Sequence, residues 1–130
     1  MKNKTGFDRQ ITQKWRRDTQ LIRGGTLRSN LGETSEAIFM TSGFAYAAAE
    51  SAQARFEGKE EGFTYSRQAN PTVAMFEERM ALLEGAEAGA ATASGMAAMN
   101  AALLGLLRAG DHVVAGRALF GSCRWLIDEL

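Results

Sequence analysis

The sequence predicts an α/β fold, in which an N-terminal arm leads into the first part of a domain with a parallel or mixed sheet. From residue 70 onward, helix-like patterns alternate with short apolar runs, the order expected for crossover units in a parallel sheet. A composition of 45% apolar and 23% charged residues over 130 positions is typical of a globular protein. We expect residues 1–62 to form the arm and residues 63–130 to begin the larger domain, with a truncated, incomplete sheet.

The arm is expected to be irregular, with one or two short helices. Its clearest helical signal is an alanine-rich stretch within residues 34–55, which we expect to end near Gly58 because glycine favours the end of a helix. No segment repeats at a fixed period, so a solenoid is excluded.

The sharpest signal is a helix after residue 70. Asn70 suits the N-cap, and Pro71 suits the first helical position because its missing N–H needs no partner there. Gly85 is expected to end the helix. Apolar residues recur at spacings of three and four and predict one apolar face, made of Val73, Phe76, Met80 and Leu83.

The remaining chain alternates between strand and helix signals. Small apolar residues predict a buried strand over 86–92, and a Ser-Gly turn leads to a helix over 96–107. A second strand is expected over 112–115, and a loop over 117–122 precedes a last helix. That helix lacks an ending signal, so we expect the domain to continue beyond this chain.

Charge is divided between the two ends of the chain. Residues 1–32 carry eight Lys or Arg against two acids, a balance of +6, whereas the other seven basic and thirteen acidic residues give −6. A basic arm could contact nucleic acid. We favour docking on an acidic surface, such as that of a second subunit, because interleaved aromatics and Gly-Arg repeats are missing. We therefore expect no nucleic-acid partner.

Several classes of protein are disfavoured by composition. Cys123 and His112 are the single cysteine and histidine, so we expect no disulfide framework, no metal site and an inert thiol. No signal peptide is visible, which favours a cytoplasmic location. Ala88 to Leu107 is uncharged for twenty residues, but its Ala and Gly content suits a membrane poorly, so we expect no membrane contact.

A candidate anion site lies at the start of the second helix. Unpaired N–H groups and the helix dipole favour an anion there, and Gly95 would let a phosphate ester approach closely. A plain serine cap with a packing glycine would explain the same residues. Upstream, Arg67 offers a bidentate phosphate donor and Tyr65 a hydroxyl, although Arg67 could equally form a surface ion pair.

Phe120 is the third candidate. It lies in the loop after the second predicted strand, at the edge where α/β proteins bind ligands. Its ring could stack on a heteroaromatic cofactor or could belong to the core.

These motifs occur in an ordered series that resembles the Cys/Met-metabolism family of pyridoxal-phosphate enzymes over nearly the whole chain. The series consists of Tyr65-Ser66-Arg67, Asn70-Pro71-Thr72, Glu77-Glu78-Arg79, Leu83-Glu84-Gly85, Ala93-Ser94-Gly95-Met96-Ala97-Ala98 and Ala109-Gly110-Asp111-His112. The resemblance implies the start of the large domain of an aspartate-aminotransferase-like fold that binds pyridoxal 5'-phosphate (PLP).

Carried over residue by residue, the resemblance implies five cofactor-binding residues. The N–H groups of Gly95 and Met96 would hold the phosphate, and Tyr65 and Arg67 would reach the phosphate of a neighbouring subunit in a homo-oligomer. Phe120 would stack on the pyridine ring, where the family usually has tyrosine. The lysine and aspartate that engage the cofactor in the family match nothing here, so we expect no catalytic residue in this chain.

The segments Thr26–Ser29 and Leu119–Cys123 resemble the sulfhydrylase branch of the family. This implies a transferase that replaces the succinate of O-succinylhomoserine with sulfide, giving homocysteine in methionine biosynthesis by trans-sulfuration. A ring without a hydroxyl at Phe120 favours this activity over cystathionine γ-synthase or γ-lyase, which stay as alternatives. A further alternative is a non-catalytic truncated paralogue that acts as an interaction module. The homo-oligomer could be a dimer or a homotetramer.

Overall fold

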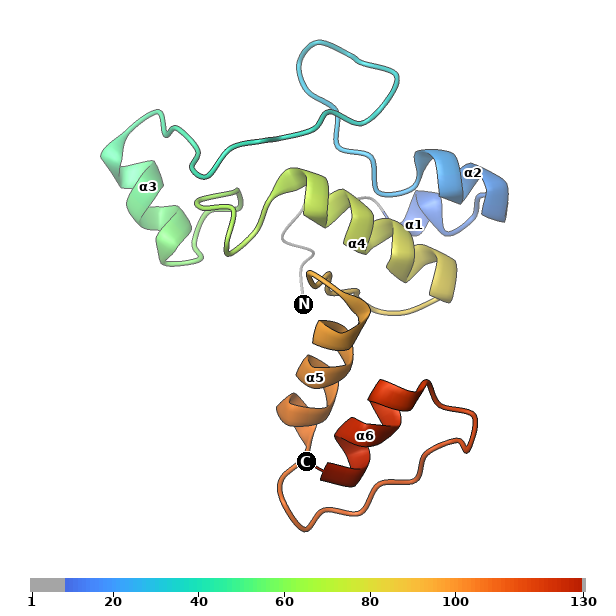
Figure 1. Ribbon diagram of the computed structural model, residues 1–130. Helices are drawn as coiled ribbons and strands as arrows, with labels where there is room; N and C mark the ends of the chain where they lie inside the picture. Colours follow the sequence, from blue (N-terminus) through green and yellow to red (C-terminus); the bar gives the residue numbers. More distant parts are fainter. Residues whose placement is uncertain (1–8, 130) are drawn as a thin grey trace. The chain divides into compact units, whose positions relative to one another are not determined.

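The computed structural model describes residues 9–129, which form two compact units, residues 9–90 and residues 91–129 (Figure 1). Each unit is described by itself. The first contains α1 (Arg9–Thr12), α2 (Arg17–Arg23), α3 (Ala49–Phe56) and α4 (Pro71–Glu84). The second contains α5 (Gly95–Leu106) and α6 (Gly121–Glu129). The functional division at residues 62 and 63 stays a prediction, while the alanine-rich helix does end just before Gly58.

The two ends of α4 are as predicted. The Asn70 side chain accepts a hydrogen bond from the N–H of Thr72 at 2.9 Å, and Pro71 occupies the first turn. Gly85 adopts a left-handed conformation with φ of 64°. The N–H of Ala86 then donates to the carbonyl of Ala81 at 2.8 Å, alongside the N–H of Gly85, as is typical of a helix that ends at a left-handed glycine.

The predicted apolar face of α4 is wrong. Val73, Phe76 and Met80 are 42%, 56% and 38% exposed, and Leu83 is half-buried. The buried face is instead made of Pro71, Ala74, Met75, Glu78, Ala81 and Leu82. Both stripes have the spacing of three and four that marks a helix face, so periodicity could not choose between them. The buried stripe is the one that faces α2 and the turn after it. Gly24 and Gly25 in that turn have no side chains, which lets the turn approach α4 closely.

A glycine pair attaches the arm to α4. Gly25 has φ of +68°, and a Cβ added there would lie 2.9 Å from the carbonyl oxygen of Met75. Arg79 reaches from α4 to the same turn, where its Nε donates to the carbonyl of Gly24 at 3.0 Å. Its guanidinium also pairs with Glu36, and partial burial lowers the pKa of Arg79. Backbone contact and an ion pair therefore fix residues 24–36 on this helix.

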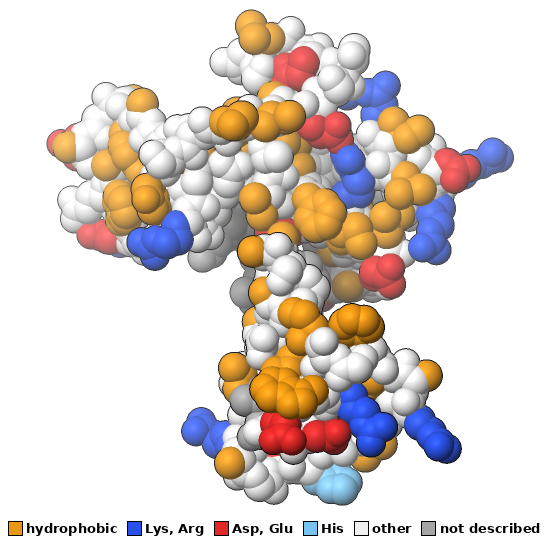
Figure 2. Space-filling view, viewed as in Figure 1, with side chains coloured by type: hydrophobic (Ala, Val, Ile, Leu, Met, Phe, Trp, Pro, Cys, Tyr) orange, Lys and Arg blue, Asp and Glu red, His pale blue; other side chains and the backbone are white. Residues whose placement is uncertain are grey.

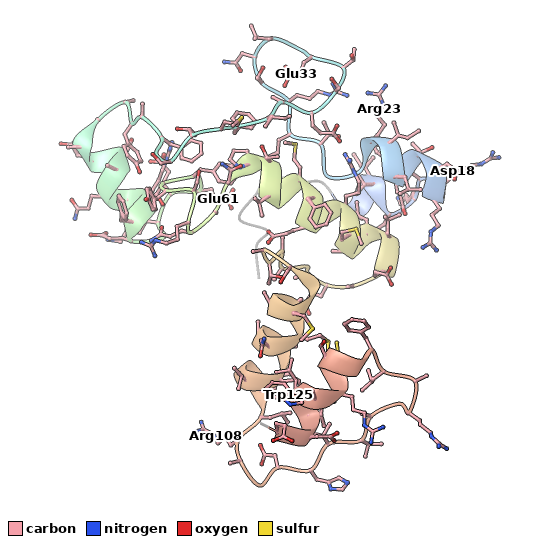
Figure 3. The ribbon with its side chains drawn as sticks, viewed as in Figure 1. Asp18, Arg23, Glu33, Glu61, Arg108 and Trp125 are labelled. Carbon is pink, nitrogen blue, oxygen red and sulfur yellow. The ribbon has the colours of Figure 1, made fainter. Side chains whose placement is uncertain are left out.

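A charged turn follows in the loop between α2 and α3, where Figure 3 labels Glu33. The Glu33 carboxylate accepts from the N–H and the hydroxyl of Ser29 at 2.6 and 2.7 Å. Arg28 donates to the Glu33 carbonyl. The two bonds from Ser29 hold the pKa of the Glu33 carboxylate below its ordinary value of 4.5.

The strands predicted over 86–92 and 112–115 are not formed among residues 9–129. Sheet pairing in this range is limited to a single bridge between Gly43 and Tyr65. A strand exists through hydrogen bonds to a neighbouring strand, and these two segments do not pair with one another. The apolar pattern of a segment does not indicate whether a partner strand lies next to it. The predicted strands were wrong for this reason.

The second unit consists of α5 packed on α6. Leu126 of α6 is 5% exposed, whereas Leu106 of α5 is 83% exposed. The last helix starts at Gly121, inside the segment predicted as a loop, because the carbonyl of Phe120 accepts from the N–H groups of Cys123 and Arg124 at 2.9 and 3.0 Å. Between residues 9 and 129, every helix is too short or too polar to cross a membrane.

Candidate functional site

The start of α5 has the geometry of an anion site. Ser94 is the N-cap, and its hydroxyl accepts from the N–H of Ala97 at 3.1 Å. The N–H groups of Gly95 and Met96 have no protein acceptor among the described residues. They lie at the positive end of a helix of 12 residues. The residues predicted to hold a phosphate are therefore the two whose donors remain available.

Gly95 does not serve as a packing glycine within the described residues. A Cβ built on it meets no atom within 4 Å, and its φ lies outside the left-handed region. Neither crowding nor backbone strain thus explains a glycine here. Ser94 does cap the helix, but a glycine that is neither packed nor strained, next to N–H groups without a protein acceptor in residues 9–129, also suits the close approach of a phosphate ester.

Phe120 directly precedes α6 and is 72% exposed. This exposure disfavours the alternative that its ring belongs to the core of the second unit. Cys123, three residues later, places its Sγ 3.9 Å from the Sδ of Met96. The first turns of α5 and α6 thus contact one another, which holds the candidate stacking residue near the candidate phosphate donors of the same unit. No sequence pattern indicated this sulfur contact.

Tyr65 and Arg67 lie together in the first unit. The guanidinium carbon of Arg67 is 5.4 Å from the centre of the Tyr65 ring, and both side chains are exposed. Among residues 9–129 the guanidinium has no carboxylate partner. The surface ion pair considered as an alternative is therefore not formed, and the cation is free to bind an anion.

The backbone under this pair is held by a hydrogen-bonded cluster that sequence reasoning missed. Asn70, recognised only as a helix cap, also donates to the carbonyl of Phe39 and to the hydroxyl of Ser66, both at 2.9 Å. Thr72 accepts from the N–H of Phe39 at 2.9 Å. The two bonds to Phe39 span 31 and 33 residues of sequence, so no local pattern could have indicated them.

The five predicted residues form two groups. Tyr65 and Arg67 belong to the first unit, and Gly95, Met96 and Phe120 belong to the second. Between residues 9 and 129, no group of three or more His, Cys, Asp or Glu side chains could hold a metal ion. The roles of the five residues toward a cofactor stay predictions.

The chain is similar to known proteins over most of its length. Residues 18–130 match the family described as Cys/Met metabolism PLP-dependent enzyme. The chain is 52% identical over 109 residues to an O-succinylhomoserine sulfhydrylase of Mycobacterium tuberculosis, covering 84% of this chain and 27% of that protein. It is 41% identical over 103 residues to an L-methionine gamma-lyase of Porphyromonas gingivalis, covering 79% and 26%. The chain therefore spans about a quarter of the length of these relatives.

A solved structure supports the same relationship. The fold matches that of a putative O-acetylhomoserine (thiol)-lyase from Campylobacter jejuni with a TM-score of 0.80 and 31% identity. The match covers 89% of this chain and 29% of the other, whose structure contains N'-pyridoxyl-lysine-5'-monophosphate. The predicted relation to the fold of PLP enzymes is thus confirmed, even though the sheet expected within it is not formed by residues 9–129. This chain belongs to the Cys/Met metabolism family of PLP-dependent enzymes.

Proposed function

We propose that this chain provides the N-terminal part of a PLP-dependent O-succinylhomoserine sulfhydrylase, which exchanges succinate for sulfide to form homocysteine. The observation that carries the proposal is that the N–H groups of Gly95 and Met96, at the start of α5, have no protein acceptor among residues 9–129. Relatives with this activity in M. tuberculosis and Pseudomonas aeruginosa are 52% and 49% identical to the chain. The homo-oligomer, as dimer or tetramer, and the cytoplasmic location stay predictions.

Each residue of the candidate site would have a distinct task. Gly95 and Met96 would bind the phosphate through backbone N–H groups, with help from the dipole of α5. Arg67 and Tyr65 of a neighbouring copy would add charge-assisted and neutral hydrogen bonds to it. PLP, when bound, supplies an electron sink that stabilises negative charge on the substrate.

Phe120 would orient the cofactor ring by stacking, because it is exposed beside the first turn of α6. Its ring has no hydroxyl and so cannot hold or move a proton. This favours replacement by sulfide over a lyase that would use a tyrosine there. The covalent lysine would come from outside these 130 residues, since the four lysines of the chain, Lys2, Lys4, Lys14 and Lys59, all belong to the arm and match no such motif.

The proposal is tested by PLP affinity in the complete enzyme. Gly95→Val should place a branched side chain beside the N–H groups and abolish tight binding, whereas Gly105→Val, at another open position of the same helix, should not. Arg67→Ala should weaken binding by about 10- to 150-fold, the equivalent of about 1.5–3 kcal/mol for a charge-assisted bond. Unchanged affinity in both Gly95→Val and Arg67→Ala would contradict the proposed site.

A γ-lyase is the second candidate, and the 41% identity to an L-methionine gamma-lyase favours it. Two assays on the same preparation separate them. Sulfide-dependent formation of homocysteine from O-succinylhomoserine supports the sulfhydrylase, and sulfide-independent release of a 2-oxo acid from methionine supports the lyase. An immediate stop codon after Leu130, together with the absence of both activities, would support a non-catalytic interaction module instead.

A further inference from the structure

The Asn70 side chain makes three hydrogen bonds at once, using both donors of its amide nitrogen and its oxygen as an acceptor. It is 8% exposed, its amide nitrogen donates to the carbonyl of Phe39 and the hydroxyl of Ser66, and its oxygen accepts from the N–H of Thr72. A helix cap requires the oxygen only. The two bonds from the nitrogen therefore serve something other than starting α4.

One of those two bonds goes to Ser66, the residue between Tyr65 and Arg67, and the other goes to the backbone of Phe39. The Ser66 N–H donates to the carbonyl of Ser42 at 2.8 Å, and its hydroxyl donates to the carbonyl of Thr41. The single sheet bridge of the described chain joins Gly43 to Tyr65 next to it. Ser66 is thus held from the backbone side and from the side of Asn70.

The exposed side chains on either side have no comparable support. Arg67 contacts the ring of Tyr65, and no side-chain hydrogen bond of either residue is found among residues 9–129. The backbone at Ser66 therefore sets the position from which both side chains leave the chain. Holding a binding group in its productive direction before the ligand arrives reduces the entropy lost on binding.

We propose that Asn70 is a positioning residue for cofactor binding: together with Ser66 and Thr72 it forms a lock that aims Tyr65 and Arg67 at the phosphate bound by a second copy of the chain. This inference rests on the proposed function. It assigns to Asn70 a role in the neighbouring site, in addition to capping α4 in its own chain.

A charge-matched pair of variants tests the lock. Asn70→Asp keeps the oxygen that caps α4 but places a second oxygen against the Phe39 carbonyl. Gln68→Glu adds the same charge to the same loop and keeps the oxygen that accepts from Thr64. In the complete enzyme, Asn70→Asp should raise the PLP dissociation constant about tenfold or more, as for loss of one charge-assisted contact. Gln68→Glu should leave that constant within about twofold, as surface changes do.

Ser66→Ala provides a second variant in case Asn70→Asp impairs folding. It removes the hydrogen bond between the Asn70 amide and the Ser66 hydroxyl but leaves the cap of α4 by Asn70 intact. Far-ultraviolet circular dichroism reports whether the helices persist. A wild-type PLP dissociation constant in a folded Ser66→Ala or Asn70→Asp enzyme would overturn the inference. If the wild-type enzyme itself fails to bind PLP, the proposed function fails, which is a distinguishable outcome.

Mixed oligomers separate a role in the neighbouring site from a general structural one. Asn70→Asp chains keep an intact α5 start, and Gly95→Val chains keep an intact Tyr65-Ser66-Arg67 loop. When the two are combined, one site per mixed pair receives the intact loop and the intact helix start. Recovery of tight PLP binding at that site supports the inference. Failure of any mixed site to recover, with the mixed oligomer shown by mass spectrometry, would refute action on the neighbouring copy.

Discussion

Replacing Gly25 by alanine probes the contact that attaches the arm to α4. At φ of +68°, a residue with a side chain costs about 1–2 kcal/mol. The new Cβ would also lie 2.9 Å from the Met75 carbonyl oxygen and 3.0 Å from the Cβ of Glu78. Such overpacking typically costs about 1–3 kcal/mol more, so the expected total loss of stability is about 2–5 kcal/mol.

Gly58→Ala is the matched control. Gly58 has φ of +71°, but a Cβ there meets no atom within 4 Å, so only the conformational cost of about 1–2 kcal/mol remains. Both variants are compared with wild type by urea unfolding, followed by circular dichroism and by tryptophan fluorescence, since Trp15 lies beside α2. Equal losses of stability in Gly25→Ala and Gly58→Ala would refute the close approach of the arm to α4.

Three further predictions concern side chains. Arg79→Ala should lower the free energy of unfolding by about 1–3 kcal/mol, because Glu36 and the Gly24 carbonyl lose their partner, and hydrogen exchange should rise in residues 24–36. Glu33 should titrate below 4.5 by NMR, and Ser29→Ala should move the value back toward 4.5. Because the folded-state pKa is lowered, the contribution of Glu33 to folding stability is fully present above its unfolded-state pKa and is lost as the pH falls through its folded-state pKa. A measured Glu33 pKa at or above 4.5 would contradict the hydrogen bonds of this turn. Leu126→Ala should cost about 2–5 kcal/mol, against less than about 0.5 kcal/mol for Leu106→Ala, and similar urea midpoints for the two would contradict the packing of α5 on α6.

Local signals in the sequence were sufficient where the chemistry itself is local. Asn70 and Pro71 start α4, and Gly85 ends it with a left-handed conformation, because capping depends on residues within one turn. The buried face of the same helix could not be predicted. Which stripe is covered depends on the close approach of Gly25, which lies 50 residues from Met75.

The candidate site shows the same division. Gly95 and Met96 could be selected in advance because a helix start leaves its first N–H groups unpaired whatever surrounds it. The contact of Cys123 with Met96 and the bonds of Asn70 to Phe39 join residues 27 and 31 positions apart. Such pairings follow from the tertiary fold, so spacing in the sequence could not indicate them.

The two apolar stripes of α4 have a consequence for mutational tolerance. One stripe is buried in the first unit, while Val73, Phe76 and Met80 remain exposed. Figure 2 shows that hydrophobic side chains occupy part of the visible surface. Polar replacements on the exposed stripe should make the isolated chain more soluble without unfolding it. In a saturation library of α4 scored for expression, positions that tolerate substitution should therefore alternate with positions that do not. The same library scored for growth would show whether the tolerant, exposed positions are needed for function.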